Sequence, residues 1–157
     1  MIDERLAKAY DSCVVEGMIV PQQDYVLPQI RNMLESSISG FRFAKKAKEI
    51  KDADWNVVYR NYYDILHLLC EAFVRLDSVK ISNHKCLFAY ICSKHPELEF
   101  DWDFFEKVRT KRNGASYYGS IISREDWKEI ELQIEIYISH LIKVLEDKLP
   151  KSDNLSV

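Results

Sequence analysis

Apolar residues recur at intervals of three and four along most of this sequence, and this spacing constrains the fold more than any other feature. The clearest case lies between residues 54 and 76, where one wide apolar stripe consists of Val58, Tyr62, Ile65, Leu66, Leu69, Cys70, Phe73 and Leu76. Residues at this spacing share one face of an α-helix, and that face must be buried against another element. With only 4 Gly and 4 Pro in 157 residues, the chain also lacks the turn residues that an all-β domain needs. The sequence therefore predicts an all-α protein.

Helix start and stop signals divide the chain into five or six helices and no strand. The helices are expected over residues 3–18, 24–51, 54–76, 83–93, 101–114 and 123–149. Asp54 is the predicted N-cap of the third helix, Ser82 can cap the fourth, and Ser123 with Asp126 resembles a capping box for the last. Asn113-Gly114 tolerates the left-handed conformation and is expected to end the fifth helix. Short connections favour an antiparallel up-and-down bundle.

The length predicts a single domain, and the net charge predicts no general attraction to other charged molecules. Residues 1–149 are expected to form this domain and residues 150–157 a disordered tail. The formal net charge of -3 gives no general attraction to nucleic acid or to a membrane, so an anion site must be local. No secretory signal and no run of 18 uncharged apolar residues is visible in the sequence. We expect a cytoplasmic protein with no membrane partner.

The cysteines are widely spaced and form no C-x-x-C pair. They are Cys13, Cys70, Cys86 and Cys92. We expect all of them to be reduced, buried thiols, as is usual in a cytoplasmic protein. The ligand spacing of a structural zinc site is absent, and neither a metal nor another cofactor is predicted.

A short basic segment stands out in this acidic sequence. It places four cations within six residues: Lys107, Arg109, Lys111 and Arg112. No acid lies between the start of this segment and Ser123. Cations near a helix C-terminus complement the helix dipole, which is an alternative account of the two lysines. The two arginines fit that account less well, so the segment predicts a local anion site.

The arginines belong to a wider set of polar side chains. Arg109, Arg112 and Asn113 lie three or four residues apart and so share one helix face. Ser116, Tyr117 and Tyr118 follow, where a turn can fold their hydroxyls back toward the arginines. Guanidinium forks, an amide and phenols that converge on one spot suit a phosphate group. The predicted phosphate- or RNA-binding residues are Arg109, Lys111, Arg112, Asn113 and Tyr118.

The motif Arg109-x-x-Arg112-Asn113-x-x-x-Tyr117-Tyr118-Gly119 resembles the signature region of the HEPN family. Tyr63-Asp64-x-x-His67 and Ser82-Asn83-His84-Lys85 are similar to the order of features in these domains, and the resemblance spans residues 24–149. It implies a helical bundle that commonly dimerises and brings two copies of the signature into one cleft. It also implies a metal-independent ribonuclease, in many cases a toxin paired with a small nucleotidyltransferase antitoxin.

The family signature places a histidine four to six residues after the arginine, and this chain has none there. Counted from Arg112, the position falls on Tyr117 or Tyr118. RNA cleavage through the adjacent 2′-hydroxyl needs a base that titrates near neutrality. Histidine, with a pKa of about 6.5, suits this role, whereas tyrosine, with a pKa of about 10, is only about 0.1% ionised at pH 7. Arg112, Asn113 and Tyr117 are the catalytic candidates, but the proton carrier is missing.

Of the four histidines, only His84 is a candidate for the missing base. It lies in the first turn of the fourth predicted helix, where packing or capping is the alternative role. His67 lies beside the apolar stripe of the third helix and is expected to be a satisfied core histidine. His95 and His140 are not candidates.

Three functions remain open. The first is a catalytically weak or silent HEPN-like domain that binds RNA or a nucleotide through the basic segment, as part of a toxin–antitoxin or defence system. The second is a protein-interaction module whose partner is another protein, such as a nucleotidyltransferase. The third is an active metal-independent ribonuclease with an unusual base. A two-fold homodimer is also expected, because the apolar and aromatic positions exceed what one face of each helix can bury.

Overall fold

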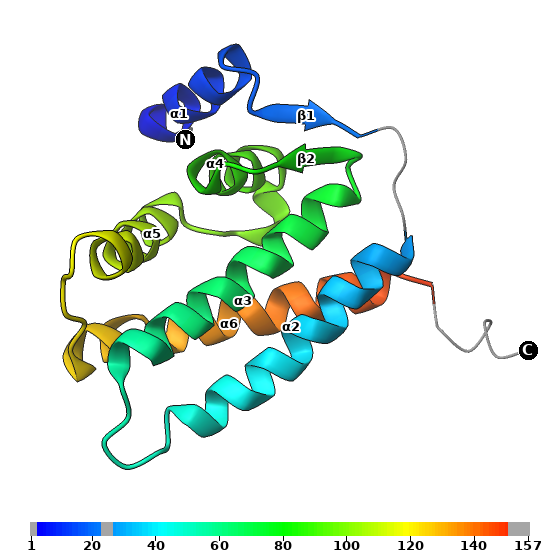
Figure 1. Ribbon diagram of the computed structural model, residues 1–157. Coiled ribbons are helices and arrows are strands. Elements are labelled where there is room, and N and C mark those ends of the chain that lie inside the picture. The colour runs from blue at the N-terminus through cyan, green and yellow to red at the C-terminus, as the bar shows by residue number, and fades with distance from the viewer. Residues whose placement is uncertain (1–2, 23–26, 151–157) are drawn as a thin grey trace, which may run out of the picture.

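The computed structural model describes residues 3–22 and 27–150, which form a mostly helical protein (Figure 1). The α-helices are α1 (Glu4–Val15), α2 (Leu27–Ala47), α3 (Trp55–Arg75), α4 (His84–Lys94), α5 (Trp102–Tyr117) and α6 (Arg124–Lys148). The strands are β1 (Ile19–Pro21) and β2 (Val79–Ile81), and the 3-10 helix η1 spans Pro96–Leu98. The predicted all-α class is confirmed. Residues 151–157 of the predicted disordered tail lie outside the described residues.

The prediction that the chain contains no strand is wrong. β1 and β2 pair in an antiparallel two-stranded sheet, with Ile19 opposite Ile81 and Pro21 opposite Val79. The first helix ends at Val15, and Gly17 follows in the left-handed region with φ of 69°. Strands of three residues are too short to show a two-residue period, so the sequence pattern could not reveal them.

Side-chain caps fix several helix starts where they were predicted. The Asp54 side chain accepts hydrogen bonds from the backbone N–H groups of the first turn of α3, and Ser123 and Asp126 form the expected capping box of α6. The fourth helix differs from the prediction. Its cap is Asn83 and not Ser82, because the Asn83 side chain accepts the backbone N–H of Cys86 at 2.9 Å.

The predicted end of the fifth helix is also wrong. α5 continues through Asn113-Gly114 to Tyr117, and the left-handed residue that follows is Gly119, with φ of 70°. A glycine in a helix interior costs only about 1 kcal/mol relative to alanine, so it permits a stop without enforcing one. The backbone N–H groups of Tyr118 and Ser120 both donate to the Gly114 carbonyl and close the last turn.

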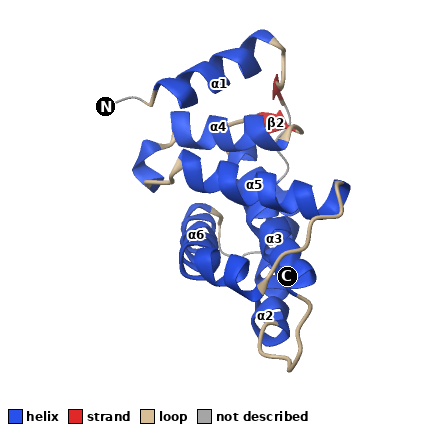
Figure 2. Ribbon diagram, turned by 90° about the vertical axis from the view of Figure 1, so that its left-hand side faces the viewer, coloured by secondary structure: helices blue, strands red, loops and turns tan. Residues whose placement is uncertain are grey.

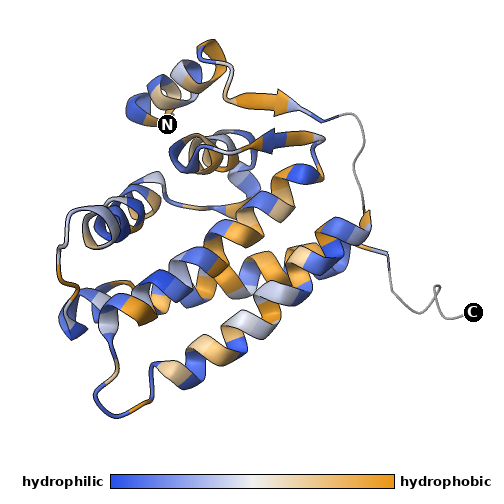
Figure 3. Ribbon diagram, viewed as in Figure 1, coloured by the Kyte–Doolittle hydropathy of each residue, from blue (hydrophilic) through white to orange (hydrophobic). Residues whose placement is uncertain are grey.

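α3 lies at the centre of the fold, with α2, α4, α5 and α6 all in contact with it (Figures 1 and 2). Hydrophobic and hydrophilic residues are interspersed along each helix, as expected of amphipathic helices that bury one face (Figure 3). The predicted stripe of α3 is buried from Val58 to Phe73, and the largest fully buried side chain is that of Trp127 of α6. The periodicity of residues 54–76 therefore identified the core helix correctly.

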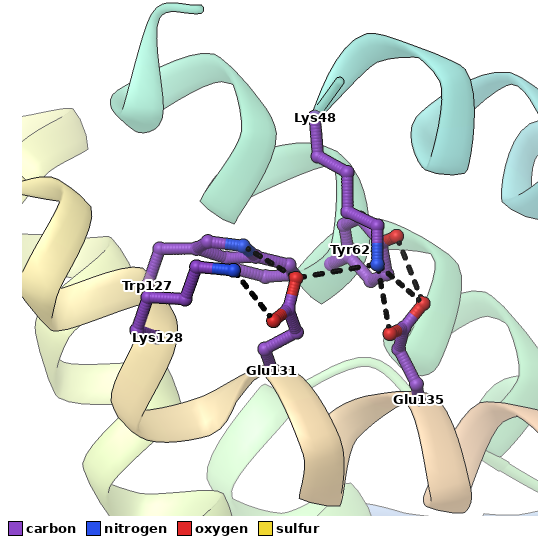
Figure 4. Close-up of polar contacts among 6 residues, drawn as sticks. All are labelled: Lys48, Tyr62, Trp127, Lys128, Glu131 and Glu135. Carbon is purple, nitrogen blue, oxygen red and sulfur yellow. Dashed lines mark hydrogen bonds and ion pairs between the residues drawn. The ribbon is translucent and has the colours of Figure 1, made fainter.

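A polar network joins α3 and α6 to Lys48, the residue that follows α2, at one edge of this core (Figure 4). The Lys48 ammonium lies 3.2 Å from the Glu131 carboxylate and 2.9 Å from that of Glu135. The Tyr62 hydroxyl donates to Glu135, and the Trp127 indole donates to Glu131. Burial opposes the charge of Lys48, but the two carboxylates outweigh this and raise its pKa. Every side chain in the network has a hydrogen-bond or ion-pair partner, so the network stabilises the packing of these helices.

A disulfide joins Cys13 of α1 to Cys86 of α4. The expectation of four reduced thiols is therefore wrong for these two residues. Cys70 is a buried free thiol, and Cys92 is free and partly exposed. The two linked cysteines are 73 residues apart, and only the packing of α1 on α4 brings them together.

Within the described ranges, none of the helices is long and apolar enough to cross a bilayer.

Candidate functional site

Arg112 is the residue on which the candidate site centres. α5 directs its guanidinium toward α3, where the central carbon lies 5.2 Å from the centre of the Tyr63 ring. One terminal nitrogen lies 3.5 Å from the Asp64 carboxylate, and the Tyr117 ring lies 6.0 Å away. The side chain is only 16% exposed, and its buried Nε has no hydrogen-bond partner among the described residues. An arginine has five N–H donors, so the described residues leave most of the hydrogen-bonding capacity of Arg112 unused.

The other cations of the basic segment are neutralised within the protein. Arg109 pairs with Glu106 one turn earlier on α5, with an Nε–Oε1 distance of 2.9 Å. The two lysines reach α6: Lys107 lies 3.0 Å from Glu129, and Lys111 lies 3.2 Å from Asp126. The predicted positive patch is therefore largely compensated. The acids that neutralise it, Glu106, Asp126 and Glu129, lie before and after the acid-free stretch in the sequence. The stretch considered alone therefore predicted too high a local positive charge.

The remaining predicted residues lie around Arg112 to different degrees. Tyr117 is near the guanidinium but is 71% exposed, and Tyr118 is 83% exposed. Asn113 is half-buried, and its side chain makes no hydrogen bond within the described part of the chain. The predicted convergence of two arginines, an amide and two phenols is thus reduced to Arg112 with Tyr117 beside it.

Two histidines complete the site on its other side. The Nδ1 atom of His84, the first residue of α4, lies 2.8 Å from the Tyr63 hydroxyl. The His84 ring stacks on that of His67, with 3.8 Å between centroids. Burial, His84 and Arg112 together lower the pKa of His67 to about 3. Burial, aided by Arg112, also lowers the pKa of His84, although Asp64 opposes the shift. Both rings are therefore neutral at pH 7.

The structure thus brings together three motifs that are far apart in the sequence. Tyr63, Asp64 and His67 come from α3, His84 begins α4, and Arg112 comes from α5. His67 was expected to be a satisfied core histidine, but its buried Nε2 lacks a hydrogen-bond partner among the described residues. The nearest carboxylate, that of Glu71, is 3.7 Å away. His67 is therefore packed as predicted but not satisfied.

A cavity of about 210 Å³ adjoins Arg112 at the end of α5 nearest the start of α3. It is lined by Asp54, Asn56, Val57, Arg60, Arg112, Ala115, Ser116 and Ile122. Arg60 supplies a second guanidinium, which has no ion pair within residues 3–22 and 27–150. The sequence analysis missed Arg60. Its spacing of four residues from Asp64, on the same face of α3, is the signal that could have found it.

The described residues offer no metal centre, since no three of their His, Cys, Asp or Glu side chains are grouped to hold an ion. The available chemistry is that of hydrogen-bond donors and positive charge around Arg112. In comparisons with known proteins, no protein-family model, no curated protein and no solved structure matches this chain.

Proposed function

We propose that this protein is a HEPN-like helical bundle that binds a phosphate group of RNA or of a nucleotide at Arg112, with little or no catalytic activity. The observation that supports this most directly is the incomplete pairing of the Arg112 guanidinium. A largely buried cation is costly unless it is paired and hydrogen-bonded. Its one carboxylate contact, at 3.5 Å, is longer than the roughly 2.7–2.9 Å of a strong charged hydrogen bond. A phosphate would supply the missing acceptors.

The neighbouring cavity supports the same ligand class. Arg60 adds a second guanidinium to the lining, and the one carboxylate in that lining, Asp54, already accepts backbone N–H groups at the start of α3. Ser116 contributes a hydroxyl to the lining. Asn56 accepts the backbone N–H of Ile122 with its Oδ1, which leaves its amide hydrogens free to donate. These groups suit the several acceptor oxygens of a phosphate.

Binding is favoured over catalysis because the signature position for a base is occupied by an exposed tyrosine. Tyr117 lies beside the guanidinium, but its phenol is a poor base near neutral pH. Arg112 can stabilise negative charge on a phosphate, and this alone does not move a proton. We therefore place RNA or nucleotide binding ahead of metal-independent ribonuclease activity.

The test compares two arginines one turn apart on the same helix. Arg112→Ala removes the incompletely paired guanidinium, whereas the control Arg109→Ala removes one that already pairs with Glu106. A hydrogen bond to a charged group contributes about 1.5–3 kcal/mol, so Arg112→Ala should weaken binding by about 10- to 150-fold. Arg109→Ala should change it by less than about threefold. Binding of fluorescently labelled single-stranded RNA and of a labelled nucleotide is measured by anisotropy at several salt concentrations.

The salt dependence provides an independent readout of the same contact. Loss of a phosphate contact should reduce the slope of log binding constant against log salt by about one, because fewer counterions are released. Circular dichroism should show that both variants remain folded. Equal affinity and equal salt slope for the parent and Arg112→Ala would refute phosphate binding at this residue.

A second candidate function, a protein interface, is favoured by a specific surface feature. Tyr117, Tyr118 and Ile121 are 71%, 83% and 82% exposed, and they lie within five residues at the end of α5 and the loop after it. Exposed apolar side chains of this size mark interaction sites when they cluster. A homodimer or a complex with a nucleotidyltransferase would cover them beside Arg112. Sedimentation of the parent and of a Tyr118→Ser, Ile121→Ser variant tests the homodimer, which only the parent should form.

A further inference from the structure

The contact between Tyr63 and His84 determines which nitrogen of the imidazole carries the proton. The Tyr63 hydroxyl oxygen lies 2.8 Å from Nδ1 of His84. Tyr63 is 0% exposed, so its hydroxyl cannot donate to bulk water. Within the described residues it has no other hydrogen-bond partner. Because a buried hydroxyl without an acceptor is costly, the Tyr63 hydroxyl donates to Nδ1.

The proton of His84 must then lie on the opposite nitrogen. A neutral imidazole has one N–H, and an Nδ1 that accepts a hydrogen bond leaves that hydrogen on Nε2. The charged groups that face the ring are Asp64 from α3 and Arg109 and Arg112 from α5. Burial of the ring disfavours a second proton, and the two arginines do the same, whereas Asp64 favours it; the pKa of His84 is lowered on balance. The Nε2 atom makes no hydrogen bond within the described ranges, so its N–H is available to a ligand.

We propose that Tyr63 is a positioning residue that holds His84 as the Nε2–H tautomer, so that His84 and Arg112 present only donors to a bound phosphate. This inference rests on the proposed phosphate binding at Arg112. The Arg112 guanidinium lies over the face of the Tyr63 ring, and His84 contacts the Tyr63 hydroxyl. Tyr63 therefore positions both the guanidinium and the imidazole. Stacking of His84 on the His67 ring restricts its rotation further. His84 then stabilises an ionised phosphate and does not remove a proton from a ribose hydroxyl.

The tautomer is measured directly by long-range ¹H–¹⁵N correlation spectra of the parent protein at pH 7.5. His84→Gln assigns the signals by their loss. The inference expects a protonated Nε2 and an unprotonated Nδ1 for His84. The opposite pattern, with hydrogen on Nδ1, would overturn it even if Arg112 binds phosphate. This measurement needs no substitution in the buried Tyr63 and so does not depend on whether a Tyr63 variant folds.

The donor role is tested with inorganic phosphate and 5′-AMP as probes. His84→Gln retains an N–H donor and should bind within about threefold of the parent, whereas His84→Leu, which lacks a donor, should bind about tenfold more weakly. Tyr63→Phe removes the hydroxyl that selects the tautomer, and its spectrum should show hydrogen on Nδ1 in part of the population. Equal binding by His84→Gln and His84→Leu would refute the donor role.

The failures of the two proposals are distinguishable. Unchanged phosphate binding by Arg112→Ala contradicts the proposed function, whatever the tautomer. Weakened binding by Arg112→Ala together with an Nδ1–H tautomer contradicts only the role assigned to Tyr63 and His84. Chelator-resistant cleavage of RNA that His84→Gln abolishes would likewise show that His84 acts as a base.

Discussion

Removal of the disulfide between α1 and α4 should cause a large and measurable loss of stability. The linked residues, Cys13 and Cys86, are 73 positions apart, so the bond closes a long loop in the unfolded chain. In the chain-entropy model, a loop of this length corresponds to about 4 kcal/mol of stabilisation at 25 °C. α1 depends on this bond in particular, because Cys13 is the single buried residue of its described helix.

The perturbations are Cys13→Ser and Cys86→Ser, with Cys92→Ser as a matched control that removes a free thiol. Guanidinium chloride unfolding is followed by circular dichroism with and without dithiothreitol. In the absence of reductant, each disulfide variant should be less stable than the parent by about 4 kcal/mol. For Cys92→Ser, as for the parent, the unfolding midpoint should fall when dithiothreitol is added. The midpoints of Cys13→Ser and Cys86→Ser should not change.

A thiol count provides the decisive check on this reasoning. Denatured, unreduced parent protein should contain two reactive thiols, those of Cys70 and Cys92. Proteolysis of the reduced protein should cleave first in or next to α1, because the thin packing of that helix no longer has covalent support. Four reactive thiols in the unreduced parent, or a midpoint insensitive to reductant, would refute the argument.

Three further predictions concern titration, helix continuity and capping. Because the folded state holds His67 neutral with a pKa of about 3, stability should fall as pH drops from about 6.5 toward 3, by up to about 1.4 kcal/mol per pH unit. His67→Gln should flatten this slope in urea titrations between pH 7 and pH 4, and parallel slopes would contradict it. Gly114→Ala should raise the free energy of unfolding by up to about 1 kcal/mol, because Gly114 lies within a continuous helix and the new Cβ meets only Ser120, at 3.4 Å. A lower melting temperature for this variant would indicate that the helix stops at Gly114. Asp54→Ala should lower the free energy of unfolding by about 1 kcal/mol through loss of the α3 N-cap, and an unchanged unfolding midpoint would exclude that role.

The sequence by itself determined the features that depend on residues close together in the chain. The apolar spacing from Val58 to Phe73 predicted the central helix, because side chains three and four residues apart share a helix face wherever the helix lies. Asp54 and the pair Ser123 and Asp126 predicted helix starts, since a cap bonds to backbone groups two or three residues away. These interactions are local, and their signals are present in the order of residues.

Only the tertiary structure decided which charged and sulfur-containing groups meet. Arg109 has a partner on its own helix, Glu106, which its spacing of three residues could have indicated, but Arg112 lies incompletely paired against Tyr63 of another helix. The rule that predicted reduced thiols concerns compartments, and it cannot show that α1 packs Cys13 against α4. Arg112 and Asp64 lie 48 residues apart, and Cys13 and Cys86 lie 73 apart, so spacing along the chain carries no record of these contacts. The packing of α3, α4 and α5 therefore determined the candidate site, because proximity in space sets pairing, burial and protonation.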